Sequence, residues 1–142
     1  MRIDGFTDGA ARGNPGHAGI GIVLKDESGK TLAEKKQYLG KTTNNVAEYS
    51  ALLECLRHLN ELLSADKKIS CSTLVVHSDS ELMVRQLNGE YKVKDKNLKT
   101  LFDAVQQVLH SSPYEFSIKH VPREKNREAD NLANESIDEH LF

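Results

Sequence analysis

The segment Phe6–Gly16 places the strongest constraint on how this chain can fold. An extended stretch runs into Asp8, and a run rich in glycine and alanine follows. Because glycine reaches backbone conformations that other residues avoid, such a run is typical of a turn or of close backbone approach. We therefore predict a strand over Arg2–Asp8 that ends at Asp8, with this carboxylate at the edge of a cleft. An acid in that position is a candidate metal ligand.

The overall composition is that of an ordinary globular domain. With 142 residues, 38% hydrophobic and 28% charged, the chain is expected to form one domain over residues 1–142. The formal net charge of −2 excludes a global basic field, so any nucleic acid would need a local patch. No stretch approaches the roughly 20 apolar residues of a membrane span, and residues 1–5 lack the apolar run of a signal peptide. We expect a cytoplasmic protein without membrane contact.

The hydrophobic periodicity predicts an α/β order of elements. Gly19 and Gly21 in the second strand indicate close backbone approach or a bulge. The first helix is expected to run for about five turns, with Asn44 or Asn45 as its N-cap. The predicted strands cover residues 2–8, 16–25, 31–39, 73–78 and 114–118. Four helices are predicted: one after the third strand, one after residue 80, one after residue 97, and one after the turn at 121–126.

Four acidic residues are expected to converge. Asp8 ends the first strand and Asp79 ends the continuous apolar run Thr73–Ser78, so parallel neighbouring strands would place their carboxylates side by side. Glu48 and Asp130 each lie in the predicted first turn of a helix, which directs a side chain toward the same rim.

Each of these acids also has a purely structural interpretation. Glu48 lies three residues after Asn45, which is the spacing of a capping box. Asp79 and Asp130 would be favourable charges at helix starts, and Asp8 would be a turn residue. A shared cleft argues against these alternatives, because two carboxylates about 4 Å apart repel by roughly 4 kcal/mol at an effective dielectric of 20. Carboxylate oxygens suit Mg²⁺ or Mn²⁺.

The two cysteines do not form a metal motif. Cys55 lies on the apolar side of the first predicted helix, and we expect a buried free thiol there. A disulfide with Cys71 is the alternative.

The chain resembles ribonuclease H type 1 over essentially its whole length. The matching motifs are Thr7–Ala10 with Gly13–Gly16, Thr43–Glu48, Ser78–Ser80 and Asn126–Ala133. The resemblance implies a ribonuclease H-like fold, with a five-stranded mixed sheet flanked by helices on both faces. It also implies endonucleolytic hydrolysis of the RNA strand of RNA–DNA hybrids, leaving 5′-phosphate and 3′-hydroxyl ends. Two divalent ions, Mg²⁺ or Mn²⁺, would be held by Asp8, Glu48, Asp79 and Asp130, with Glu48 close to the ribose 2′-hydroxyl.

Substrate contacts follow from the same resemblance. Asn14, Asn44 and Glu81 match family positions that contact the RNA strand. Thr43 and Asn45 match positions near the DNA strand. Turn and cap chemistry is their structural alternative. Arg12 could hold a phosphate or be a solvated turn charge.

Two departures from the family pattern stand out. Many relatives carry a histidine loop before the last helix, whereas here Val121–Asn126 has none; Arg123 or Glu124 could substitute, and His120 is expected to end the fifth strand. Many relatives also carry a long basic, tryptophan-rich insertion. This chain has no tryptophan and only the lysines of residues 92–99 there, so it resembles the compact archaeal-type branch.

Two other functions stay open from sequence. One is a module of ribonuclease H fold that binds nucleic acid without cutting it. The other is a different nuclease on the same fold, such as a junction resolvase, although such enzymes lack the Thr43–Glu48 motif. No exposed apolar helix demands a partner, so we expect a monomer.

Overall fold

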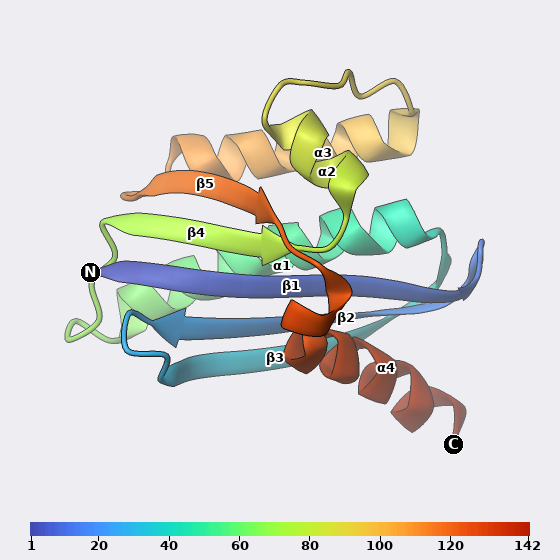
Figure 1. Cartoon of the computed structure of the whole chain (residues 1–142), viewed down its shortest axis with the longest axis horizontal. Coiled ribbons are helices and arrows are strands. Elements are labelled where there is room, and N and C mark those ends of the chain that lie inside the picture. Colours follow the sequence, from blue (N-terminus) through green and yellow to red (C-terminus); the bar gives the residue numbers. More distant parts are fainter.

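The computed structural model describes all residues from Met1 to Phe142 and contains one five-stranded sheet flanked by helices (Figure 1). The strand order is β3-β2-β1-β4-β5. β1 pairs with β2 and β2 with β3 in antiparallel fashion, whereas β4 pairs in parallel with both β1 and β5. The predicted mixed sheet is thus confirmed. Its elements are β1 (Arg2–Gly13), β2 (Gly16–Asp26), β3 (Thr31–Thr42), α1 (Asn44–Ala65), β4 (Thr73–Ser78), α2 (Glu81–Leu87), α3 (Lys96–His110), β5 (Glu115–His120), a 3-10 turn (Arg123–Lys125) and α4 (Arg127–Leu141).

The prediction that β1 ends at Asp8 is wrong. β1 continues to Gly13 because β2 remains paired with it, from Ile3↔Asp26 through Gly13↔Gly16. What ends at this point is the parallel pairing with β4, whose last partners are Thr7 and Ser78. Asp8 therefore lies within β1 and is the first residue of this strand that has no partner on β4.

Helix α1 also differs from its prediction. Thr43 caps it, because its hydroxyl accepts the Val46 N–H at 3.2 Å, whereas Asn44 and Asn45 are already helical. With 22 residues, α1 has about six turns rather than five. None of the helices combines the length and the apolarity needed to cross a bilayer.

The main core lies between the sheet and helices α1 and α3. It consists of 19 buried residues, among them Ile3, Ile20, Leu52, Leu56 and Leu74. Cys55 belongs to it and is a free thiol, as predicted, and Cys71 is free too.

Helix α4 covers part of the opposite face of the sheet (Figure 1). Two glycines of β2 permit its close approach. A Cβ on Gly19 would lie 2.0 Å from Ser136 Oγ, and one on Gly21 would lie 2.0 Å from the Ala129 carbonyl oxygen. The sheet register also shifts between Ala18 and Gly19. Close approach is thus confirmed for both glycines, whereas the register shift beside Gly19 adds its extra residue, Leu39, on β3 and does not involve Gly21.

Candidate active site

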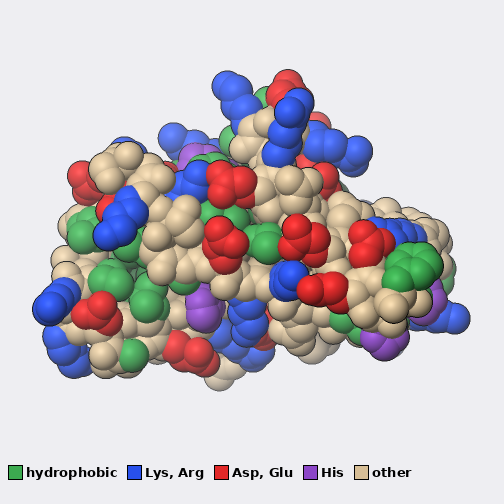
Figure 2. All heavy atoms as spheres, turned by 90° about the horizontal axis from the view of Figure 1, so that it is seen from below, with side chains coloured by type: hydrophobic (Ala, Val, Ile, Leu, Met, Phe, Trp, Pro, Cys, Tyr) green, Lys and Arg blue, Asp and Glu red, His purple; other side chains and the backbone are tan.

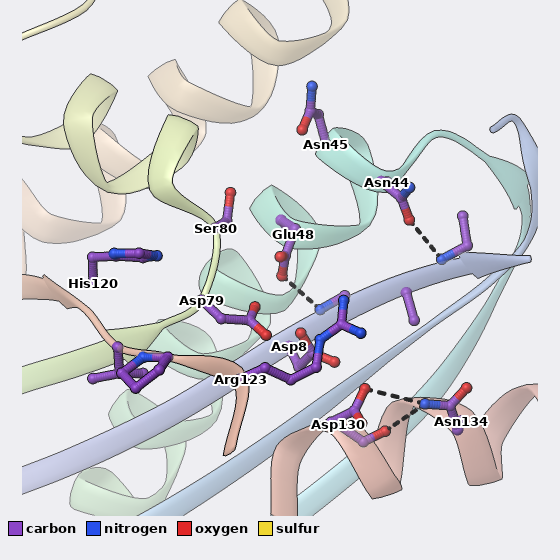
Figure 3. Close-up of a pocket in the computed structure, with 15 residues that line it drawn as sticks. Asp8, Asn44, Asn45, Glu48, Asp79, Ser80, His120, Arg123, Asp130 and Asn134 are labelled. Atoms are coloured by element: carbon purple, nitrogen blue, oxygen red, sulfur yellow. Dashed lines mark hydrogen bonds between the residues drawn. The ribbon is translucent and has the colours of Figure 1, made fainter. Parts of the chain in front are cut away.

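Asp8 and Asp79 lie side by side where β1 and β4 separate. Thr7 and Ser78 are the last parallel partners, so the next residue of each strand segment faces the same opening. Figure 3 shows the Asp8 and Asp79 side chains directed toward each other. Ser80 caps α2 through its hydroxyl, which accepts the Met83 N–H at 3.3 Å, so the chain turns away immediately after Asp79. The parallel arrangement that predicted this pair is confirmed.

Glu48 reaches the same point from α1, and Gly9 makes this possible. A Cβ on Gly9 would lie 2.2 Å from the carbonyl carbon of Ala47, so only glycine lets β1 pass this close to the helix. The Gly9 N–H donates to Glu48 Oε1 at 2.7 Å. Because Thr43 is the cap, Glu48 lies beyond the first turn, and the capping-box interpretation is wrong.

Asp8, Glu48 and Asp79 form one compact acidic group. One carboxylate oxygen from each residue lies within 4.8 Å of the other two. Asp8 is 4% exposed and Glu48 is 8% exposed. Burial, reinforced by the neighbouring charges of Glu48, Asp79 and Asp130, raises the pKa of Asp8 well above its usual range. Burial and the charge of Asp79 likewise raise the pKa of Glu48. Such a group binds protons or cations, because either relieves the repulsion.

Asp130 borders the same cleft from α4 but stands outside the three-residue group. Its Oδ1 accepts a hydrogen bond from Asn134 Nδ2 at 3.2 Å, and its backbone carbonyl accepts from the same nitrogen at 3.0 Å (Figure 3). The structure therefore brings three of the four predicted acids into one mutual group, and the fourth, Asp130, lies beside Asp8 and helps to raise the pKa of Asp8.

The cleft around these acids has a volume of about 480 Å³ and a mostly polar lining. Arg123 contributes a positive charge, which lowers the pKa of Glu48 against the larger effects that raise it. His120 is the last residue of β5, as predicted, and it also lines the cleft, which the sequence did not predict. Other lining residues include Asn44, Asn45, Ser80 and Asn134.

The charges on one face of the molecule are mixed in sign. The face shown in Figure 2 carries interspersed acidic and basic side chains, in keeping with the net charge of −2. A polyanion would therefore meet no broad positive field on this face.

The chain shows clear similarity to known proteins. It matches the family model described as reverse transcriptase-like over residues 6–136. Ribonuclease HI of Halobacterium salinarum is 36% identical over 97% of this chain and 65% of its own length. A bifunctional protein of Mycobacterium tuberculosis is 40% identical over 97% of this chain and 36% of its own length. This chain thus spans between about a third and two thirds of these curated relatives.

The solved structures extend this similarity to the fold. The crystal structure of LC11-RNase H1 in complex with an RNA/DNA hybrid is 46% identical, covers 99% of both chains and has a TM-score of 0.92. The chain belongs to the type 1 ribonuclease H family. The family resemblance inferred from the four short motifs is confirmed, as is the likeness to an archaeal ribonuclease H, whose structure matches with a TM-score of 0.88.

The ribonuclease H motif residues expected to contact substrate fall into two groups. Asn14, Asn44 and Thr43 form a polar frame at the start of α1: Asn14 Oδ1 accepts the Asn44 N–H at 3.1 Å, and Asn44 Oδ1 accepts the Ala11 N–H at 2.9 Å. Asn45 and Arg123 line the cleft. Their predicted roles as substrate contacts remain predictions.

The remaining two candidates are engaged elsewhere. Glu81 accepts a hydrogen bond from Arg85 Nε at 3.0 Å and is absent from the lining of the cleft. Arg12 Nη1 donates to Asp138 Oδ1 at 2.6 Å, so its guanidinium is occupied by α4. A phosphate contact by Arg12 would require this ion pair to open.

Two contributors to the site were not predicted from the sequence. The hydrogen bond from the Gly9 N–H to Glu48 joins residues 39 positions apart. Asn134 follows Asp130 by four residues on the same helix, which is the spacing of neighbouring side chains on one helical face. This spacing could have predicted from the sequence that Asn134 contacts Asp130.

Proposed function

We propose that this chain hydrolyses the RNA strand of RNA–DNA hybrids with the help of two divalent ions, Mg²⁺ or Mn²⁺, leaving 5′-phosphate and 3′-hydroxyl ends. The observation that carries the proposal is the group of three carboxylates within 4.8 Å, two of them buried, in a member of the type 1 ribonuclease H family. A relative of similar length has been solved with an RNA/DNA hybrid.

The residues present fit divalent cations. The donor atoms are all carboxylate oxygens, the ligands that Mg²⁺ and Mn²⁺ prefer, and no cysteine or histidine belongs to the group. Buried acids with raised pKa values are held in a charged form only if a cation offsets their repulsion. Asp8, Glu48 and Asp79 would hold the ions, with Asp130 completing the site from α4. Ions in such a site supply an activated water and stabilise the departing oxygen.

The chain's own residues orient the substrate around this group. Glu48 is fixed by the Gly9 N–H, so its second oxygen can face the ribose next to the scissile phosphate. The 2′-hydroxyl there is the feature that distinguishes RNA from DNA. The polar frame of Asn14, Thr43 and Asn44 would follow the hybrid beside the site, and Asn45 lines the cleft next to it. Arg123 supplies the positive charge that a phosphate needs.

A cleavage assay tests this proposal. A hybrid with labelled RNA is incubated with the protein and Mg²⁺ or Mn²⁺, and cleavage is expected with either ion and absent in EDTA. Asp8→Asn should lower the rate at least about 1,000-fold, because it removes a charge that the ions require. Asp103→Asn is the matched control, since Asp103 is an exposed acid on α3 that pairs with Lys99. Equal cleavage by Asp8→Asn and the parent would contradict the mechanism.

The same assay separates the alternatives. Hybrid binding without cleavage at any ion concentration would mean a non-catalytic module. Preferential cleavage of duplex DNA or of a DNA junction would mean another nuclease on this fold. A cytoplasmic location and a monomeric state stay predictions, which fractionation and sedimentation would test.

A further inference from the structure

Asp130 differs from the other three acids in how it is held. Asp8 and Asp79 are fixed by the sheet, and Glu48 by the Gly9 N–H. Asn134 Nδ2 donates one hydrogen bond to Asp130 Oδ1 and another to the Asp130 backbone carbonyl, and no backbone N–H donates to this carboxylate. Asn134 itself lines the cleft.

Arg12 fixes which way the Asn134 amide points. Arg12 Nη2 lies 3.3 Å from Asn134 Oδ1 and 3.4 Å from the Asn134 carbonyl oxygen. A guanidinium can only donate hydrogen bonds, so the amide oxygen must face Arg12. The amide NH₂ group therefore faces Asp130. Arg12 is in turn anchored by Asp138, which lies one helical turn beyond Asn134.

We propose that Asn134 is a positioning residue for the metal site and that Arg12 sets the polarity of its amide. This inference rests on the proposed function, because it takes Asp130 as a metal ligand. With Oδ1 engaged by Asn134, the Asp130 carboxylate is held in one orientation, and its other oxygen is left to bind a cation. Hydrogen-bonded partners of metal ligands commonly change metal affinity 10–100-fold when they are removed.

The alternative is that Asn134 only stabilises helix α4, because its amide also donates a hydrogen bond to the Asp130 backbone carbonyl. That role would change the thermal stability and leave the metal affinity alone. Binding of Mn²⁺ to the free protein, measured by calorimetry without any nucleic acid, distinguishes the two roles.

The experiment compares five variants with the parent: Asn134→Ala, Asn131→Ala, Arg12→Ala, the double Arg12→Ala/Asn134→Ala, and Asp130→Asn. Asn134→Ala should weaken Mn²⁺ binding about 10-fold and shift the Mn²⁺ dependence of hybrid cleavage by the same factor. Cleavage should recover at saturating Mn²⁺. Asn131→Ala is the matched control, because Asn131 is an exposed asparagine on the same helix. It should bind Mn²⁺ as the parent does.

Arg12→Ala tests the polarity argument. Removing Arg12 frees the amide to rotate, so Mn²⁺ binding should weaken about 3-fold, less than for Asn134→Ala. The double variant should be no weaker than Asn134→Ala alone, because Arg12 acts through the amide. Additive losses would overturn the role of Arg12.

The outcomes also separate this inference from the proposed function. If Asp130→Asn weakens Mn²⁺ binding and cleavage but Asn134→Ala binds Mn²⁺ like the parent, the positioning role is wrong and the proposed function stands. If the parent cleaves no hybrid, the proposed function fails. If Asp130→Asn binds Mn²⁺ and cleaves hybrid like the parent, Asp130 is not a metal ligand, so the positioning role fails while the proposed function stands. Thermal unfolding of each variant identifies any loss of folding.

Discussion

The two helices that bring acids to the site do so in different ways. Helix α1 belongs to the main core, with nine buried residues, and its Glu48 is buried and bonded to a backbone N–H. Helix α4 buries four residues, Ala129, Ala133, Ser136 and Ile137, and its Asp130 is held by a side chain. One carboxylate is thus fixed by the backbone of the sheet and the other by polar contacts near the surface.

The outer contacts of the two helices differ as well. α4 is tied to the sheet by ion pairs at its edge, including Arg12–Asp138, Lys25–Glu128 and Lys36–Glu139. Exposed pairs of this kind contribute little individually. We therefore expect the α1 side of the site to form a rigid half and the α4 side to adjust without unfolding of the core.

The largest effect is expected at Gly9, on the rigid side. Gly9→Ala would place its Cβ 2.2 Å from the Ala47 backbone, and α1 cannot retreat because its inner face is packed into the core. We expect a loss of about 3 kcal/mol or more in the free energy of unfolding, which corresponds to a fall in Tm of about 10 °C. Denaturant unfolding measures it, and a loss below about 1 kcal/mol would contradict the rigidity of this half.

Gly21→Ala makes the matching change on the α4 side. Its Cβ would lie 2.0 Å from the Ala129 carbonyl, and we expect α4 to move outward as a unit because its outer contacts are exposed ion pairs. We expect a stability loss of about 2 kcal/mol. Hybrid cleavage should fall about 100-fold, because Asp130 moves with the helix and misplacement of about 1 Å has that effect. Parent-like cleavage by a folded Gly21→Ala protein would show that the position of α4 is unimportant.

Asp8 lies between the two halves and carries the pH dependence. Its pKa is raised in the folded protein, so above the unfolded pKa of about 4 the folded state binds more protons than the unfolded state. Stability of the metal-free protein must then fall as the pH rises. Asp8→Asn removes the cost of ionising this buried carboxyl next to other acids. In EDTA at pH 8 the variant should therefore be more stable than the parent by about 1.5 kcal/mol, which is less than the roughly 4 kcal/mol of repulsion in one fully ionised pair of carboxylates.

Thermal unfolding in EDTA between pH 4 and pH 8 measures this effect. The difference between Asp8→Asn and the parent should shrink toward pH 4, where the Asp8 carboxyl is protonated in the folded state and, with an unfolded pKa of about 4, already half protonated in the unfolded state. Added Mn²⁺ should stabilise the parent and have little effect on the variant. A variant that is less stable than the parent at pH 8 would contradict the repulsion inferred for the acidic group.

The smallest effect is expected at the outer edge of α4. Lys36 pairs with Glu139 at 2.9 Å and with Glu135 at 3.3 Å, and both acids are largely exposed. Lys36→Ala should cost less than about 1 kcal/mol, and the cost should shrink in 0.5 M salt. Chemical unfolding at two salt concentrations checks this expectation. A larger, salt-independent loss would mean that α4 is held more firmly than its burial indicates.

The sequence alone was sufficient to predict the order of the elements and the neighbouring positions of Asp8 and Asp79. The apolar run Thr73–Ser78 matches β4 residue for residue, because a strand covered on both faces is a short, continuous apolar run rich in β-branched residues. The adjacency of Asp8 and Asp79 followed from the parallel pairing that this run implied. Local composition and periodicity were sufficient for these conclusions.

Only the tertiary structure decided how the acids are held. β1 passes Asp8 because β2 stays paired with it, Glu48 is fixed by Gly9 across 39 residues, and Asn134 depends on Arg12 across 122. Each of these contacts joins segments that are distant in the chain. Their formation depends on how closely backbones approach once the core is packed, and glycines such as Gly9 and Gly21 set that distance. A sequence pattern records which residues can turn or pair, whereas the packed fold fixes which donor reaches which oxygen.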